Sequence, residues 1–211
     1  MIYKLTDIVR DVRVAIDQNM TSAPLLATDD VETLALDTLI RSKVVEGVRR
    51  VESTAPVQFL EEGHDFIDSV YWMEYESGWL LLPDDFMRLI AFRMSDWEQT
   101  VFAAISPDDP QYAKQSSRFK GIRGNAQKPV CAVVNRAEGK VLEFYSCKSC
   151  DAYVARASYV PYPHIDDDRG VDISERCYQA VVYTIAALVV STYGEYEKAQ
   201  TLTELAKSIF Q

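Results

Sequence analysis

The chain has 211 residues, of which 48% are hydrophobic and 26% are charged, so it can bury a sizeable core as one domain or as a domain with an insertion. Its formal net charge of -10 excludes a protein that binds nucleic acid by neutralising phosphates over its whole surface, because that mode of binding needs an excess of Lys and Arg. A local basic patch stays compatible with this composition.

The sequence predicts no secretory signal and no segment that spans a membrane. The N-terminal residues MIYKLTDIVRDV carry a charge every three or four positions, whereas a secretory signal needs an uninterrupted apolar core. The longest apolar run, from Ala180 to Val190, is interrupted by Thr184 and is too short to cross a bilayer. We therefore expect a soluble protein that is made in a reducing cytoplasm.

The N-terminal part of the chain predicts two helices. Apolar residues recur at helical spacing over residues 5–19, and residues 20–28 look like a connection. Asp29 and Glu32 then resemble a capping box for a second helix that runs to about Glu52. Two antiparallel helices with so short a connection predict an αα-hairpin.

The middle of the chain has short segments rich in aromatic and β-branched residues, which predict strands. The stretch from Phe86 to Met94 follows a turn signal and alternates with both parities largely apolar, which favours a strand covered on both faces. Asp84 or Asp85 can also cap a helix over the same residues, so helix remains the alternative. The clearest hairpin signal runs from Asn135 to Lys140. Strands are expected at residues 57–60, 66–75, 79–82, 88–94, 101–105, 129–134, 141–146 and 152–159.

The segment from Pro107 to Lys128 has no convincing period, and a loop of that length inside a compact domain is usually functional, disordered or ordered by a neighbour. Between Gln111 and Arg136 the sequence has six basic residues and no acidic one. Three interpretations stay open: a solvated flexible loop, docking on an acidic face of another copy or a partner, and nucleic-acid contact with Phe119 as the stacking residue. The candidate interface residues are Lys114, Arg118, Phe119, Lys120, Arg123 and Lys128, with Arg136 as the sixth cation.

If the basic segment is a docking element, we expect it to be flexible in the free subunit and ordered beside a neighbour. Charge reversal of Arg118, Lys120 and Arg123 together should then weaken association and leave the melting of the monomer nearly unchanged. The acidic residues that can supply the complementary surface are Glu61, Glu62, Asp65, Asp68, Glu74 and Glu76.

The last part of the chain returns to helical spacing. Asp172 or Ser174 can cap a helix that is nearly apolar all round, and its apolar residues, Leu188 among them, are expected to be central to the core. Gly194 is a plausible terminator for this helix. A last amphipathic helix is expected over residues 199–209.

Together these patterns predict an α+β fold in which terminal helical hairpins form a bundle with a β-rich insertion between them. The bundle is expected to comprise residues 1–55 and 164–211. The insertion is expected to comprise residues 56–163, with the long basic loop at residues 107–128.

A search for catalytic and metal-binding motifs gives no positive case for an enzyme. The patterns GxGxxG, Walker A and GxSxG are all missing. Cys147 and Cys150 have the spacing of a zinc knuckle or a redox pair, but a second CxxC or a CxxH is missing, and His64 and His164 are far away in the sequence. The acidic run at residues 166–168 begins like a calcium loop and then lacks its glycine and its final Glu. We expect no catalytic residue, no cofactor and no bound metal.

Several stretches together resemble a known family of structural proteins. They are LLLPDDFMRLIAFRMSDW, the loop PDDPQYAKQSSRFKGIRGNAQKPVCAVVN, the strand GKVLEFYS, and YVPYP before the closing helices. This combination resembles the head-to-tail adaptors of short-tailed bacteriophages, of the tail tubular protein A type, and is most similar to the ring proteins below the portal of crAss-like phages. The resemblance covers roughly residues 80–211, and its motifs are structural rather than catalytic.

The resemblance implies a homo-oligomeric ring, expected to be a dodecamer, at the head-tail junction of a virion. The portal protein and further tail ring or tail proteins are the implied partners, and double-stranded genomic DNA would pass through the lumen without sequence-specific binding. No membrane is implied, and no catalytic residue can be carried over. The competing interpretation is a nucleic-acid-binding module or an enzyme of unknown type.

Overall fold

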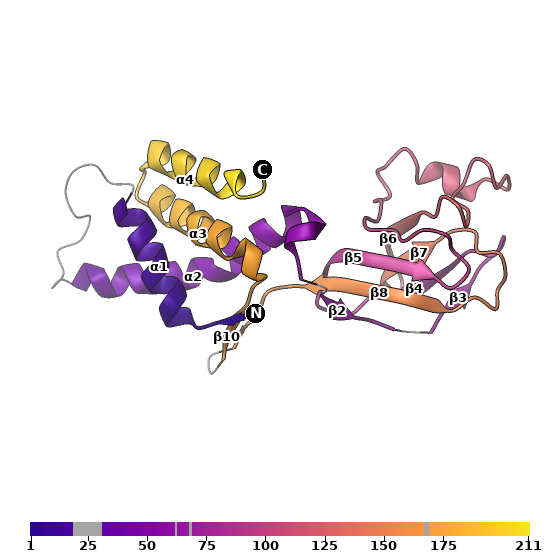
Figure 1. Ribbon diagram of the computed structural model, residues 1–211, viewed down its shortest axis with the longest axis horizontal. Helices are drawn as coiled ribbons and strands as arrows, with labels where there is room; N and C mark the ends of the chain where they lie inside the picture. Colours follow the sequence, from indigo (N-terminus) through magenta and orange to yellow (C-terminus); the bar gives the residue numbers. More distant parts are fainter. Residues whose placement is uncertain (19–30, 62, 68, 167–168) are drawn as a thin grey trace. The chain divides into compact units, whose positions relative to one another are not determined.

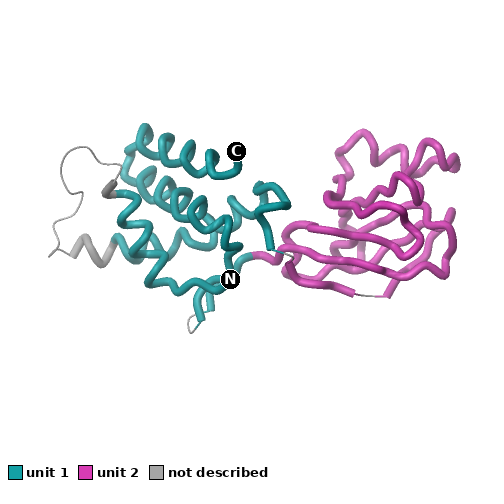
Figure 2. Tube along the Cα trace, in the orientation of Figure 1, with its two compact units in different colours: residues 1–61, 163–211 teal, residues 62–162 magenta. Residues whose placement is uncertain are grey.

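The computed structural model of the chain describes residues 1–18, 31–61, 63–67, 69–166 and 169–211. The chain divides into two compact units, which Figure 2 shows in different colours. Unit 1 comprises Met1–Glu61 and Pro163–Gln211, and unit 2 comprises Glu62–Tyr162. Each unit has its own cluster of buried apolar side chains.

Helix α3 (Tyr178–Thr192) is the centre of unit 1. It carries apolar residues on nearly all sides, and most of its residues from Ala180 to Val190 are buried. Each of the other described helices packs against α3 (Figure 1), because a helix that is apolar all round must be covered on several sides. These helices are α1 (Leu5–Gln18), α2 (Val31–Thr54) and α4 (Tyr196–Ser208).

The expected fold class, terminal helical hairpins forming a bundle with a β-rich insertion, is wrong. The described residues form a mixed α/β structure with four α-helices and three small antiparallel sheets: helices at the N-terminus, a β-rich stretch, and helices at the C-terminus. Helices α1 and α2 do not pair as an αα-hairpin, because they contact each other little and each packs on α3. Helical spacing identifies the apolar face of a helix but not the helix that covers it. The expected connection at residues 20–28 and the capping residue Asp29 lie outside the described residues.

Two expectations for α3 have different outcomes. Gly194 follows the helix with a φ of 81°, a left-handed value that glycine adopts without strain, which confirms it as the terminator.

Leu188 is only partly buried, because it faces a groove between α2 and α4 rather than the core. A charge at Leu188 is therefore a weaker test of the core than a charge at Ile185, which is fully buried.

Unit 1 also contains a sheet that the sequence pattern did not predict. Its strands β1 (Ile2–Tyr3), β10 (Gly170–Asp172) and β9 (Ile165–Asp166) are antiparallel and lie in that order. Strands of two or three residues are too short to show an alternating pattern.

The connections around this sheet correct two further expectations. The strand expected at residues 57–60 is a 3-10 helix, η1 (Val57–Phe59). Another 3-10 helix, η3 (Glu175–Cys177), precedes α3, so neither Asp172 nor Ser174 caps α3. The hydroxyl of Ser174 instead accepts a hydrogen bond from the backbone N–H of Glu61 at 2.9 Å.

Unit 2 consists of two antiparallel sheets and the long basic segment. The first sheet has the order β2-β8-β5 and the second has the order β3-β4-β7-β6 (Figure 1). The strands are β2 (His64–Asp65), β3 (Tyr71–Trp72), β4 (Gly78–Leu81), β5 (Phe86–Met94), β6 (Cys131–Arg136), β7 (Gly139–Phe144) and β8 (Val154–Pro161).

Strand β5 confirms the preference for a strand at residues 86–94 over a helix. It pairs with β8 along its length, and register shifts between Leu89 and Ala91 leave Ile90 as an extra residue of a β-bulge. All four consecutive residues from Leu89 to Phe92 are buried, which explains why both parities of the stretch are apolar.

The core of unit 2 is aromatic. The ring centroids of Phe92 and Trp97 lie 5.7 Å apart, and those of Phe92 and Phe144 lie 5.8 Å apart, in the range where aromatic pairs attract each other.

The hairpin predicted at residues 135–140 is confirmed: β6 and β7 pair from Cys131 to Arg136, with Arg136 opposite Gly139. The strand expected at residues 101–105 is wrong, because Val101 and Ile105 form only isolated bridges.

Gly47 of α2 packs closely against Ile185 of α3, and this contact gives a first prediction. A Cβ added at Gly47 would clash with Cγ1 of Ile185, so the side chain of Ile185 or one of the two helices would have to shift. We expect Gly47→Ala to lower the free energy of unfolding by about 1–3 kcal/mol, because overpacking outweighs the gain of about 1 kcal/mol in helix propensity. The helical signal in far-UV circular dichroism during urea denaturation measures this. Gly121→Ala is the control, since nothing lies within 4 Å of an added Cβ there; an equal effect of both substitutions would contradict the packing argument.

Glu52 in α2 gives a prediction for the pH dependence of unit 1. Its side chain is buried and accepts a hydrogen bond from the backbone N–H of Ser174 at 3.0 Å. Burial raises the pKa of Glu52, and the Ser174 N–H opposes that rise. Because the folded state holds the proton more tightly than the unfolded state, stability is lost as pH rises from the ordinary Glu pKa through the raised one.

We therefore expect Glu52→Gln to remove this loss. The free energy of unfolding of the variant, minus that of the parent, should increase from acidic to neutral pH. Urea denaturation at a series of pH values, followed by far-UV circular dichroism, measures the difference and cancels the titration of other groups. A difference that stays constant with pH would contradict the account of Glu52.

Candidate functional site

The basic segment at residues 107–128 belongs to unit 2, and side-chain contacts tie it to the rest of that unit, whereas the sequence pattern led us to expect a loop that is flexible in the free subunit. It contains a short 3-10 helix, η2 (Ala113–Ser116). The buried side chain of Gln115 joins the two ends of the segment: its Nε2 donates to the carbonyl oxygen of Gln111 at 2.9 Å, and its Oε1 accepts from the N–H of Gly124 at 2.8 Å. A glutamine that satisfies backbone groups in this way replaces the periodic hydrogen bonds that the segment lacks.

Asn125 organises the second half of the segment. Its Nδ2 donates to the carbonyl oxygen of Lys120 at 3.0 Å, and its Oδ1 accepts from the N–H groups of Gln127 and Lys128 at 3.0 and 3.1 Å. Asn side chains favour turns for this reason. The sequence signal Gly-Asn was present, but it does not reveal which carbonyl the side chain reaches.

Arg123 is the third anchor, and its position separates it from the other candidate residues. Only 4% of Arg123 is exposed, and its guanidinium carbon lies 4.7 Å from the centre of the Tyr75 ring. A desolvated cation over an aromatic face is attracted by about 2 kcal/mol. Arg123 therefore holds the segment in place and is not available to a partner.

A buried carboxylate fastens the start of the segment to the second sheet. Glu143 accepts hydrogen bonds from the hydroxyls of Tyr145 and Tyr112 at 2.5 and 3.3 Å and from the guanidinium of Arg136 at 2.6 and 3.0 Å. The guanidinium of Arg136 also lies 5.1 Å from the Trp79 ring. Burial, followed by the neighbouring Glu143, raises the pKa of both tyrosines. We assign this cluster a structural role, because both carboxylate oxygens of Glu143 already accept hydrogen bonds from side chains of the cluster.

The remaining candidate residues form the exposed surface of the segment. Phe119 and Ile122 are 57% and 54% exposed. The guanidinium carbon of Arg118 lies 5.0 Å from the Phe119 ring, and Lys120 forms an ion pair of 3.5 Å with Glu76 of the same chain. We define the basic surface as the exposed residues Lys114, Arg118, Phe119, Lys120, Ile122 and Lys128. Cations beside exposed apolar side chains can bind an acidic partner surface or a phosphate backbone.

The acidic residues expected to complement this surface are divided between the two units. Glu61 belongs to unit 1, whereas Asp65, Glu74 and Glu76 belong to unit 2. Glu62 and Asp68 lie outside the described residues.

The cysteine pair has unequal environments. Cys147 is 2% exposed, and burial together with Asp96 raises the pKa of its thiol to about 12, whereas Cys150 is exposed. A buried protonated thiol is a poor nucleophile and a poor metal ligand. Within the described part of the chain, no three His, Cys, Asp or Glu side chains lie close enough together to hold a metal ion.

No family model and no curated protein matches the chain. Among the described residues, no helix has the length and apolar character needed to cross a membrane.

The different positions of Arg123 and Arg118 give a prediction. We expect Arg123→Gln to lower the free energy of unfolding of unit 2 by about 1–3 kcal/mol, because the contact with Tyr75 is lost from a buried site. Arg118→Gln removes the same charge from the exposed surface and should change it by less than about 0.5 kcal/mol. Tryptophan fluorescence during urea denaturation reports unit 2 alone, since all three tryptophans lie there. Equal effects of the two substitutions would contradict the assigned role of Arg123.

Proposed function

We propose that the chain is a structural virion protein that assembles with copies of itself into a ring. The ring is proposed to be a head-to-tail adaptor beneath the portal of a short-tailed bacteriophage, with a dodecamer as the proposed copy number. The portal protein and further tail proteins are its proposed partners. The chain is made in the host cytoplasm and then resides at the head-tail junction.

The observation that carries this proposal is the basic surface on a chain whose net charge is -10. Its cations and the exposed side chains of Phe119 and Ile122 are presented by a segment that Gln115, Asn125 and Arg123 hold in one conformation. A preorganised surface loses less conformational entropy on binding than a flexible loop does, which suits permanent assembly. The resemblance of residues 80–211 to phage adaptors supplies the particular kind of assembly.

The charge of the chain also supports a channel for DNA. A ring of chains that are each strongly acidic repels the phosphate backbone over most of its surface, so genomic DNA can slide through the lumen without sequence-specific contacts. In this role the chain needs no catalytic residue and no cofactor.

Negative-stain electron microscopy of the purified chain, alone and with its portal protein, tests the proposal. We expect closed rings, either free or seated on the portal. Compact monomers in both samples would overturn the adaptor proposal.

Charge reversal tests the part played by the basic surface. Arg118→Glu with Lys120→Glu should weaken association most strongly at low salt, where charge complementarity acts over a longer range. Arg123 is left out because it is buried, and its replacement would disturb folding. Lys148→Glu with Arg156→Glu makes the same change of charge at exposed positions outside the segment and is the control. Normal assembly of the first variant would show that the basic surface is not an interface.

A second candidate function, a nucleic-acid-binding module, is favoured by one observation. Arg118 and the exposed ring of Phe119 lie together, an arrangement that can contact phosphates and stack on a base. Fluorescence anisotropy with single-stranded and double-stranded DNA over a range of salt concentrations distinguishes this function. Affinity that falls steeply with salt, and that Phe119→Ala weakens, would support the second candidate over the first.

A further inference from the structure

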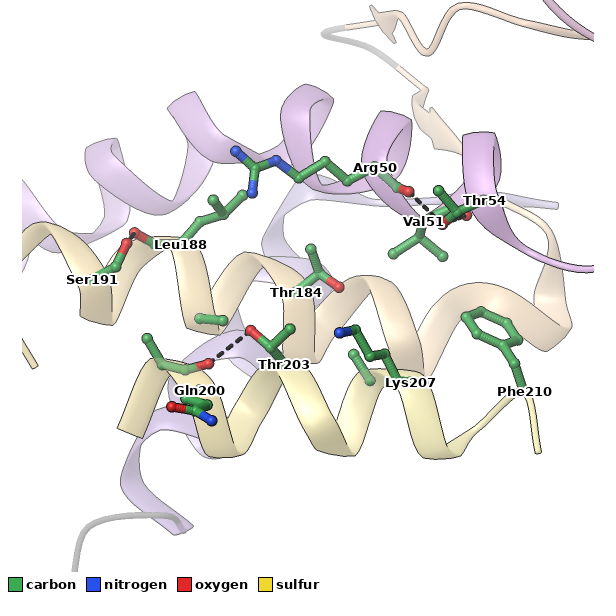
Figure 3. Close-up of a pocket in the computed structure, with 13 residues that line it drawn as sticks. Arg50, Val51, Thr54, Thr184, Leu188, Ser191, Gln200, Thr203, Lys207 and Phe210 are labelled. Carbon is green, nitrogen blue, oxygen red and sulfur yellow. Dashed lines mark hydrogen bonds between the residues drawn. The ribbon is translucent and has the colours of Figure 1, made fainter. Parts of the chain in front are cut away.

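A groove runs along α3 between α2 and α4, and its volume is about 370 Å³ (Figure 3). Thr184 and Leu188 of α3 form its floor. The walls carry Arg50 and Thr54 from α2 and Thr203 and Lys207 from α4. The groove lies entirely within unit 1, whereas the basic surface belongs to unit 2.

Several of the Ser and Thr side chains that line the groove have hydroxyl groups that are bonded within their own helices. The hydroxyl of Thr203 donates to the carbonyl oxygen of Ala199 at 2.8 Å, and the hydroxyl of Ser191 donates to that of Leu188 at 2.8 Å. Thr54 likewise donates to the carbonyl oxygen of Arg50 at 2.9 Å. Because these hydroxyls are satisfied by their own helices, their carbon atoms are free to contact an apolar occupant.

The charges of the groove are positive. Arg50 and Lys207 both line it, and none of the described lining residues is acidic. Arg50 forms an ion pair of 2.6 Å with Glu46, which lies outside the groove. An occupant with aromatic or aliphatic side chains and a carboxylate therefore fits the groove better than a neutral or basic one.

The turn between α3 and α4 has the complementary character. Tyr193 and Tyr196 are 52% and 73% exposed, although tyrosine rings gain free energy when they are covered. Glu195 and Glu197 lie beside them, and Glu195 pairs with Lys198 at 2.8 Å, so Glu197 is the exposed carboxylate of the group. We call Tyr193, Glu195, Tyr196 and Glu197 the tyrosine turn.

We propose that the tyrosine turn of one copy occupies the groove of the next copy. A cavity of roughly 150 Å³ holds one benzene ring, so the groove has room for both tyrosine rings. Glu197 then approaches the cations Arg50 and Lys207. The turn cannot fill the groove of its own chain, because both of its rings are exposed there. A contact between two different surfaces of the same protein is heterologous, and it generates a ring when the rotation closes.

This inference rests on the proposed assembly into a ring, but not on the place of that ring in a virion. Rings that form through another interface would leave the proposed function intact and overturn this contact. A chain that assembles through the contact but does not bind a portal would overturn the proposed function and leave the contact intact.

Single substitutions test the two halves of the contact by light scattering after size-exclusion chromatography. Tyr196→Ser removes the most exposed ring, and Thr203→Trp fills the groove from its own wall. Each should weaken assembly roughly tenfold or more, as the loss of a central aromatic contact does. The controls are Tyr153→Ser, at an exposed tyrosine of unit 2, and Thr201→Trp, on α4 but outside the groove. Assembly of either test variant at the level of its control would overturn the proposal.

Charge exchange gives an independent test. Lys207→Glu and Glu197→Lys should each weaken assembly, and the chain that carries both should recover it, because the charges are then exchanged across the contact. A double variant that is no better than the single variants would count against the contact.

Mixing the Tyr196→Ser and Thr203→Trp chains tests most specifically whether the contact joins two different surfaces. In a heterologous contact the Tyr196→Ser chain keeps its groove and the Thr203→Trp chain keeps its tyrosine turn. At concentrations where each variant alone is monomeric, equal amounts of the two should therefore form a one-to-one heterodimer and nothing larger. A mixture that stays monomeric, or that forms rings, would overturn the proposal.

Discussion

Helix α3 must be covered on nearly all sides, and the arrangement of unit 1 follows from this requirement. Apolar side chains surround the helix, and Ala180, Ile185 and Val189 are fully buried. The helices α1, α2 and α4 cover it, but the strip at Thr184 and Leu188 is only partly buried. The same helix therefore organises the core and leaves the groove that a second copy is proposed to fill.

Unit 2 contains a long segment that has little periodic secondary structure and is held by side-chain contacts. The segment is fixed at separate points by Gln115, Asn125 and the buried guanidinium of Arg123, and Tyr112 joins it to Glu143. These contacts consume polar groups inside the unit and leave cations and apolar side chains outside. Surfaces of this kind suit association with a partner.

The sequence predicts the features that depend on neighbours along the chain. Strand β5 and the hairpin around Gly139 have clear local patterns, and both are found as expected. The pairing of α1 and α2 was wrong, because the choice of partner depends on α3, which lies at the other end of the chain. The sequence likewise placed Arg123 with Arg118 among the candidate interface residues, because both are basic. The contact that separates Arg123 from the others is with Tyr75, which lies in a different part of the sequence. The groove was missed because its residues come from separate parts of the chain, mostly from α2, α3 and α4, and carry no motif.

The central claim is that copies of this chain meet through two different surfaces, and disulfide cross-linking tests it most directly. Tyr196→Cys and Thr203→Cys are combined in one chain with Cys150→Ser, which removes the exposed native thiol. Seven residues of helix span about 10 Å, too far for a disulfide within one chain. Mild oxidation should give a ladder of covalent species that grows by one chain at a time and ends at the closed ring. Products that stop at the dimer, or that do not form at all, would contradict the claim.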